Sequence, residues 1–146
     1  MYRYKKTEKK ENTALGRRGE ELAAQYLEQN GFRILVRNYY AAHCEIDIIA
    51  TDAQTLIFVE VKTRTVDPAS LEASPFTNRP SRAVTAAKQR NILSAARAYL
   101  REQSPQGLRM RFDVIELYLR QGADPDAMDI VKIHHIRNAF TVTSRY

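Results

Sequence analysis

The chain has no tryptophan, one cysteine, and only five glycines and five prolines among its 146 residues. A single cysteine excludes an internal disulfide framework and suits a reducing compartment, so we expect a cytoplasmic protein. No stretch approaches the ~18 apolar residues of a membrane span, and the basic start lacks the apolar segment of a signal peptide. With 44% hydrophobic residues, the composition is that of a globular protein, and the length fits one domain.

Acidic residues are scarce in two parts of the chain, whose net charge is +6. Residues 79–111 contain eight basic residues and one acid, and residues 1–10 contain five basic residues and one acid. Such clusters favour a polyanionic partner, because each neutralised phosphate releases condensed counterions. A solvated helix face and a floppy tail would explain the same counts. If nucleic acid is the partner, we expect its phosphates to contact Arg82, Lys88 and Arg90.

Hydrophobic periodicity predicts two helices and five strands in the order α-β-β-β-α-β-β. The helices are expected at about 13–30 and 81–103, and the strands at about 32–40, 43–51, 55–64, 108–120 and 129–136, with a long loop at 65–80. This order gives an α/β sandwich with a mixed sheet flanked by helices. We expect a disordered basic tail at 1–12, a single domain at 13–140 and a C-terminal tail at 141–146.

The first predicted helix has an apolar stripe interrupted by glycine. Gly16 and Gly19 are poor helix formers, so they suggest a close backbone approach to a neighbouring element. Gly31 is placed to end the helix in a left-handed conformation.

Two consecutive strands carry charged residues where core residues would be expected. In CEIDIIATDAQTLIFVEVKTR, residues 44–64, alternation places Glu45 and Asp47 on one face and Ile46 and Ile48 on the other. Continuous apolar runs near the turn indicate that this hairpin is covered on both faces there. The charges begin where that cover ends, as they would at a site on the rim of a core.

The length of the turn sets which residues of the two strands face each other. A four-residue loop at 52–55 would place Asp47 opposite Glu60, and Glu45 opposite Lys62. Like charges directly opposed, with Cβ atoms ~4.5–5.5 Å apart, destabilise a sheet. Glu45 and Lys62 could form an ordinary ion pair, whereas Asp47 and Glu60 need a cation. A hard cation such as Mg²⁺ would relieve their repulsion, although a solvated sheet face with a chance charge pair is the alternative.

These residues resemble the PD-(D/E)xK nuclease signature: Asp47, a gap of twelve residues, then Glu60-Val61-Lys62. More closely, residues 13–140 resemble the uncharacterised bacterial YraN family, which is distantly similar to archaeal Holliday junction resolvases. The further stretches that carry the resemblance are GRRGEELAAQYLEQNGFRIL, RNY, EIDIIA, FVEVKTR, AVTAAKQRNILSAARAYL, RFDVI and NAF. Cys44 stands where the family usually has glycine. The resemblance implies a restriction-endonuclease-like sandwich.

Carried over to this sequence, the resemblance implies that Asp47 and Glu60 bind Mg²⁺ or Mn²⁺, with the Val61 carbonyl as a third ligand. Lys62 would orient the attacking water or stabilise charge on the phosphorus, and Glu20 on the first helix would complete the catalytic set. Because carboxylates surround it, Lys62 should keep its proton, which favours an electrostatic stabiliser over a general base. From the residues alone, Glu20 could equally be a solvated helix glutamate.

Other polar residues have simpler explanations. Asp113 shares a strand face with Arg109 and Arg111, where we expect a structural salt bridge. His134 and His135 alternate on a strand, so they cannot converge on one metal.

The leading hypothesis is a metal-dependent nuclease that hydrolyses phosphodiester bonds in DNA rather than RNA, with branched or structured DNA in repair or recombination as one candidate substrate. A symmetric junction cutter would require a homodimer. The alternative is a non-catalytic nucleic-acid-binding or accessory module that retains the nuclease fold. A pure binder has no need to keep Asp47, Glu60 and Lys62 together, which favours the enzyme.

Overall fold

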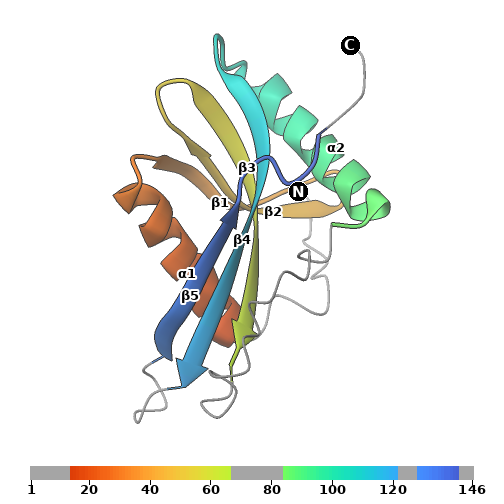
Figure 1. Ribbon diagram of the computed structural model, residues 1–146. Coiled ribbons are helices and arrows are strands. Elements are labelled where there is room, and N and C mark those ends of the chain that lie inside the picture. Colours follow the sequence, from red (N-terminus) through yellow and green to blue (C-terminus); the bar gives the residue numbers. More distant parts are fainter. Residues whose placement is uncertain (1–13, 67–83, 122–127, 142–146) are drawn as a thin grey trace.

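The computed structural model describes residues 14–66, 84–121 and 128–141. The predicted N-terminal tail lies outside these residues, and so does the predicted C-terminal tail except for position 141. Most of the predicted long loop and Arg82 also lie outside them. The described elements are α1 (Ala14–Gln29), β1 (Arg33–Ala41), β2 (Cys44–Thr51), β3 (Thr55–Thr65), α2 (Ala86–Gln103), β4 (Arg109–Gln121) and β5 (Met128–Ile136). They follow the predicted order, as Figure 1 shows. Neither described helix is long and apolar enough to cross a membrane.

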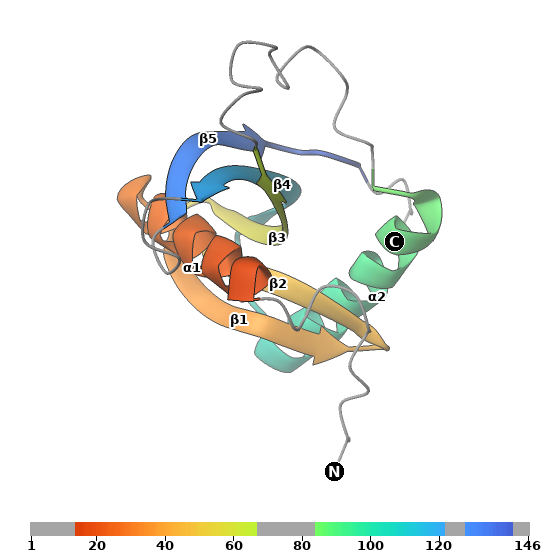
Figure 2. The ribbon, with the colours of Figure 1, turned by 90° about the horizontal axis from the view of Figure 1, so that it is seen from below.

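The five strands form one mixed sheet in the order β1-β2-β3-β4-β5. Neighbouring strands are antiparallel except β3 and β4, which are parallel. Parallel neighbours need a crossover connection, and α2 lies within it. Figures 1 and 2 show α1 and α2 on different sides of the curved sheet, α1 packed mainly on β3 and α2 mainly on β2. The predicted α/β sandwich is therefore confirmed.

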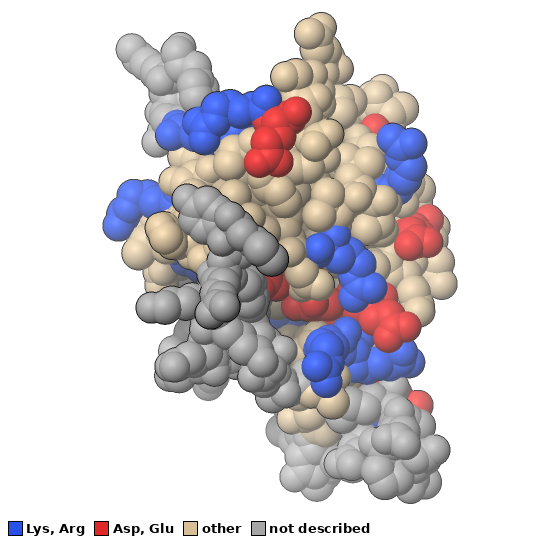
Figure 3. Space-filling model, turned by 180° about the vertical axis from the view of Figure 1, so that it is seen from behind, with Lys and Arg blue, Asp and Glu red and all other residues tan. Residues whose placement is uncertain are grey.

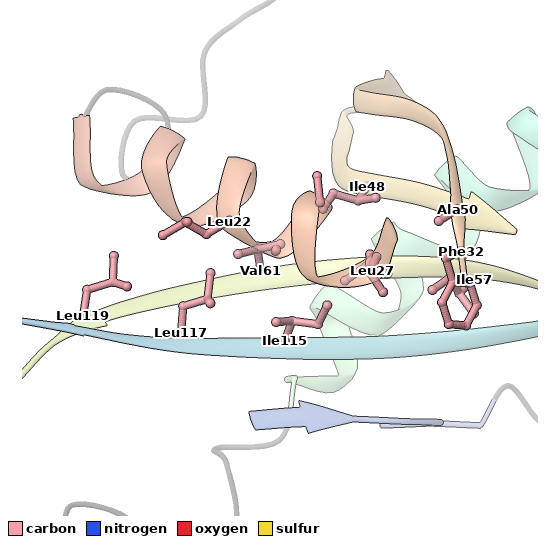
Figure 4. Close-up of a cluster of buried hydrophobic side chains, with 13 residues drawn as sticks. Leu22, Leu27, Phe32, Ile48, Ala50, Ile57, Val61, Ile115, Leu117 and Leu119 are labelled. Carbon is pink, nitrogen blue, oxygen red and sulfur yellow. The ribbon is translucent and has the colours of Figure 1, made fainter. Parts of the chain in front are cut away.

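The first core lies between α1 and the sheet (Figure 4). Its helix residues recur at the predicted helical spacing, and they pack on alternating apolar residues of the central strands. Gly19 sits directly on β3, where a Cβ would overlap the side chain of Thr63, so the predicted close approach is confirmed. Gly31, with φ of +88°, follows the helix as predicted. The close approach of Gly19 to Thr63 also fixes the position of the next residue of α1, Glu20, against the sheet.

The second core lies between α2 and the other face, and it contains the stacked rings of Phe58 and Phe112. The prediction that this helix begins near 81 is wrong, because α2 begins at Ala86. Thr85 has extended φ and ψ of −57° and 154°, and its hydroxyl accepts a hydrogen bond from the amide of Lys88. This N-cap satisfies an amide that has no partner within the helix.

Candidate metal centre

The site lies where β2 and β3 separate. Their ladder has four pairs, from Thr51–Leu56 to Ile48–Val59, in the register that the four-residue loop predicts. The predicted continuation to Asp47–Glu60 and Glu45–Lys62 is wrong, because neither pair belongs to this ladder. Instead, the Asp47 carboxylate accepts a 2.8 Å hydrogen bond from the amide of Val61. A side chain thus occupies the space between the two diverging strands.

At Asp47 strand β2 also changes the faces to which its side chains point. Ile48 belongs to the core under α1, whereas Ile46 belongs to the core under α2. Regular alternation would put both isoleucines on one face, so the predicted alternation fails at this residue. The neighbouring strand is irregular at the same place: Asn38, between the partners of Ile48 and Ile46, has a left-handed φ of +54°. Asparagine is among the few residues that tolerate this conformation.

Three carboxylates converge at this irregularity. Glu20 from α1 and Glu45 and Asp47 from β2 each offer one oxygen, and these oxygens lie within 4.8 Å of one another. The Asn38 amide nitrogen, in the orientation that satisfies its hydrogen bonds, donates to Glu45 Oε1 at 2.8 Å and to Glu20 Oε2 at 2.9 Å. Asp47 is only 3% exposed, and the other two acids are half-buried. Acids gathered this closely with little water around them require positive charge.

The donor set fits a hard divalent cation. Carboxylate oxygens are the ligands that Mg²⁺ and Mn²⁺ prefer, whereas zinc and softer metals favour nitrogen and sulfur. The nearby Cys44 thiol does not change this preference. Burial raises the pKa of Cys44, so the thiol keeps its proton, and its sulfur lies 3.6 Å from the Glu45 carbonyl oxygen. The residues could therefore hold Mg²⁺ or Mn²⁺.

The structure brings two of the four predicted catalytic residues, Glu20 and Asp47, into this cluster. Glu60 is buried at 7% exposure on β3, one residue before Val61, whose amide bonds Asp47, and it is not part of the group of three acids. Lys62 follows on the same strand and is half-buried. Besides burial, the charges of Lys88, Glu60, Asp47 and Glu45 also shift the pKa of the Cys44 thiol, in that order of size. Four charged groups therefore lie within electrostatic reach of one sulfur atom.

The predicted nucleic-acid contacts divide into three cases. Lys88 lies in the first turn of α2, is half-buried, and lowers the pKa of the Cys44 thiol against the larger effect of burial. It therefore lies near the acids. Arg90 is exposed on the same helix. Arg82 lies outside the described residues.

Two residues of the cluster, Glu45 and Asn38, are not among the site residues that the sequence predicts. The sequence predicts an ion pair for Glu45 and assigns no role to Asn38. A signal for Asn38 was present, because asparagine is depleted in strand interiors and this one lies within RNY, a stretch that carries the family resemblance. Glu45 likewise lies within EIDIIA, which also carries the resemblance, but its meeting with Glu20 depends on the separation of β2 from β3.

Comparison with family models matches residues 19–117 to "Uncharacterised protein family UPF0102". The chain belongs to the UPF0102 family. UPF0102 proteins of Chlorobium limicola and Chlorobium chlorochromatii are 46% and 47% identical to it, over 87% and 88% of this chain and 92% of each relative. The UPF0102 protein of Rhodococcus opacus is 40% identical over 88% of this chain and 98% of its own length. The predicted membership is confirmed, because UPF0102 is the YraN family.

Apart from the acidic cluster, this UPF0102 chain has a second buried polar network. The Asp113 carboxylate accepts hydrogen bonds from Arg111 at 2.8 Å, from the Asn138 amide at 2.9 Å, and from His135 at 2.7 Å. His135 also contacts the hydroxyl of Tyr26 on α1 at 3.1 Å. The predicted salt bridge of Asp113 is confirmed, and the two histidines diverge as predicted, since His134 is exposed. The network joins α1 to β4 and β5, which fixes the helix that carries Glu20.

Proposed function

We propose that this chain is a divalent-metal-dependent nuclease that hydrolyses phosphodiester bonds in DNA, with Mg²⁺ or Mn²⁺ as its cofactor. The observation that carries the proposal is the convergence of Glu20, Glu45 and Asp47 within 4.8 Å, at the point where β2 and β3 separate. The remaining residues of the nuclease signature, Glu60 and Lys62, lie on β3 directly after Val59, the last residue that pairs with β2. Three close acids and a buried fourth on the next strand supply the oxygen ligands that a hard divalent cation needs.

The acids of this chain have distinct tasks in the proposal. Asp47, oriented by the Val61 amide, and Glu60 are the proposed metal ligands, together with the Val61 carbonyl. Glu20 and Glu45, held by the Asn38 amide, would complete the oxygen donors directly or through water. A bound divalent cation would polarise a non-bridging phosphate oxygen and activate a water molecule.

In the proposal, the metal ion supplies one positive charge at the phosphate, and Lys62 supplies a second one from the protein. It lies two residues beyond Glu60, on the same side of β3, so its ammonium is expected to reach a phosphate held at the acids. Phosphodiester hydrolysis builds negative charge on the phosphorus oxygens, and a fixed cation there lowers the barrier.

DNA is the proposed substrate, with branched or structured DNA in repair or recombination as the finer suggestion. On the face shown in Figure 3, one group of Asp and Glu side chains has Lys and Arg side chains directly above and below it, and further acidic side chains lie apart from this group. An acidic centre with basic surroundings suits a metal-bridged phosphate flanked by further phosphates. We propose that Lys88, Arg90 and Arg82 contribute to these surroundings. Symmetric cleavage of a four-way junction would require two copies of the chain.

The decisive experiment is a cleavage assay with linear, single-stranded, flapped and four-way DNA, at increasing Mg²⁺ or Mn²⁺. The wild-type protein should cut at least one substrate, chelation should abolish cutting, and Asp47→Asn should abolish it too. Asp129→Asn is the matched control: it removes one carboxylate charge from an exposed side chain of β5 and should cut at the wild-type rate. Failure of the wild type to cut any of these substrates with either metal would contradict the proposal.

Binding separates the nuclease from the alternative of a nucleic-acid-binding module. In both cases DNA affinity should fall steeply with salt, and joint charge reversal of Arg82, Lys88 and Arg90 should weaken it. A nuclease should in addition cut DNA at a rate that falls when Lys62 is replaced, whereas a binding module should not cut at all. Salt-dependent binding without metal-dependent cutting would favour the binding module.

A further inference from the structure

A buried carboxylate outside the acidic cluster has an acceptor that no described residue pairs with. Glu116 on β4 is 2% exposed, and its Oε2 atom accepts a 2.6 Å hydrogen bond from the hydroxyl of Tyr118. Its other oxygen, Oε1, has no hydrogen-bond partner among the residues that the structure describes. Buried polar atoms are almost always paired, and leaving a charged one unpaired is costly. Oε1 therefore marks a position that a donor or a cation would occupy.

The sheet places Lys62 beside this oxygen. Glu116 and Lys62 are direct partners in the parallel ladder of β4 and β3, so their side chains leave the sheet on the same side. An earlier pair of the same ladder, Phe58 and Phe112, shows this arrangement, because its rings are stacked. On the other side of Glu116 the antiparallel ladder brings His134, whose side chain is exposed. Lys62 is thus the direct ladder partner of Glu116 with a fixed positive charge, whereas Arg64 and Lys132 pair with Tyr118, two residues further along β4.

We propose that Glu116 is a positioning residue for Lys62, which holds the ammonium beside the phosphate when a divalent cation occupies the acids. The inference rests on the proposed function, because it needs that cation. Strand β3, which carries Glu60 and Lys62, lies between β2 with the cluster acids Glu45 and Asp47 and β4 with Glu116. When the acids are neutralised by a cation, the ammonium is repelled by that cation and attracted to Glu116. Oε1 is the acceptor available to it there.

The consequence is a coupling between Glu116 and metal affinity that passes through Lys62. Without the Glu116 charge, the Lys62 ammonium is attracted less strongly away from the acids. It therefore competes with the divalent cation for them. Metal binding should then weaken. If Lys62 is absent, nothing competes, and the Glu116 charge should matter little.

Calorimetric titration with Mg²⁺ tests this by a double-mutant cycle. Glu116→Gln keeps the shape and the contact with Tyr118 while removing the charge, and Lys62→Met keeps most of the stem. With Lys62 present, Glu116→Gln should weaken Mg²⁺ binding by roughly 3- to 30-fold, which lies within the range of coupling between neighbouring residues. In the Lys62→Met background the same change should alter affinity by less than about 2-fold, as additive sites would.

Two controls keep the cycle interpretable. Glu28→Gln removes an equal charge from an exposed position of α1 and should leave Mg²⁺ affinity unchanged. Melting curves in metal-free buffer show whether each variant folds, and Glu116→Met, which puts an apolar side chain in the buried position, replaces Glu116→Gln if that variant does not.

The outcomes separate this inference from the proposed function. An equal loss of affinity in both backgrounds, or no loss in either, overturns the positioning role of Glu116 and leaves the nuclease proposal standing. Absence of Mg²⁺ binding by the wild type overturns both. If the wild type binds Mg²⁺ but cuts no DNA, the nuclease proposal fails, while the cycle still decides whether Glu116 acts through Lys62.

Discussion

The amide of Val61 donates a 2.8 Å hydrogen bond to Oδ2 of Asp47, although the two residues belong to strands that have already stopped pairing. This bond connects the central acid of the cluster to the strand that carries Glu60 and Lys62. Asp47 cannot turn away without leaving a buried amide unsatisfied, a loss that typically costs about 1–3 kcal/mol. The acid is therefore held in place before any metal arrives.

Metal binding should stabilise the fold through Asp47. A ligand that binds only the native state raises the free energy of unfolding, by about 2.7 kcal/mol at 100 times its dissociation constant. Mg²⁺ or Mn²⁺ should therefore raise the Tm of the wild type, and Asp47→Asn should abolish the rise while keeping an acceptor for the Val61 amide. Differential scanning fluorimetry measures both, with Asp129→Asn as the control that keeps the rise. A wild-type Tm that does not change when millimolar Mg²⁺ or Mn²⁺ is added would count strongly against the site.

Asn38 should stabilise the metal-free protein more than the metal-bound one. Its amide bridges Glu20 and Glu45, so Asn38→Gly, which tolerates the φ of +54°, should cost about 1 kcal/mol of unfolding free energy in metal-free buffer. Mg²⁺ should recover part of this loss, because a cation between the acids relieves the repulsion that the amide had reduced. Asn38→Ala should cost about 1 kcal/mol more, since alanine is strained at this φ. Urea titrations with and without Mg²⁺ test this, and an identical Asn38→Gly loss in both buffers would refute the bridge.

Lys62 should matter for rate more than for binding. If it stabilises charge in the transition state, Lys62→Ala should reduce turnover by roughly 10²–10³, as loss of one such donor does. DNA affinity should fall only by the loss of one phosphate contact. Lys62→Arg keeps the charge but spreads it over a planar group, so it should restore binding better than rate. Single-turnover rates and binding constants on a cleaved substrate decide the matter, and wild-type rates in Lys62→Ala would disprove this role.

Asp113 should make the free energy of unfolding depend on pH in the acidic range. Burial alone would raise the pKa of Asp113, but hydrogen bonds from His135, Arg111 and the Asn138 amide outweigh it, so the pKa is lowered. A carboxyl whose folded-state pKa lies below its unfolded value contributes stability above that unfolded value, about 3.9, and loses it as the pH falls further.

The matching variant is Asp113→Asn. At pH 7 it should lose about 3 kcal/mol of unfolding free energy, because Arg111 and His135 lose a buried anionic partner. Below pH 4 the difference between wild type and variant should shrink. Urea unfolding at pH 7, 5, 4 and 3 measures it, and a difference that stays constant from pH 7 to pH 3 would show that the Asp113 charge contributes nothing.

Local patterns in the sequence are enough to predict the helices, the strands and the short-range geometry. The apolar stripe of α1, the close approach at Gly19, and the register of the β2–β3 hairpin near its turn all follow from local periodicity and a four-residue loop. These features depend on neighbours within about a helical turn or across one tight loop, which a pattern can encode. The resemblance of the signature residues identified the family in the same way.

Which acids meet in the cluster depends instead on long-range packing between strands and helices. The hairpin register is valid as far as Ile48–Val59 and fails beyond it, because the left-handed residue Asn38 and the change of face at Asp47 occur together across two strands. Glu45 joins Glu20 for that reason.

The position of Glu116 beside Lys62 likewise comes from a parallel pairing between strands that are more than forty residues apart in the chain. Parallel strands are joined by long crossovers, and a crossover that includes a helix does not set the register as a two-residue turn would. Packing of both helices against the sheet sets it instead, through contacts that no local pattern records.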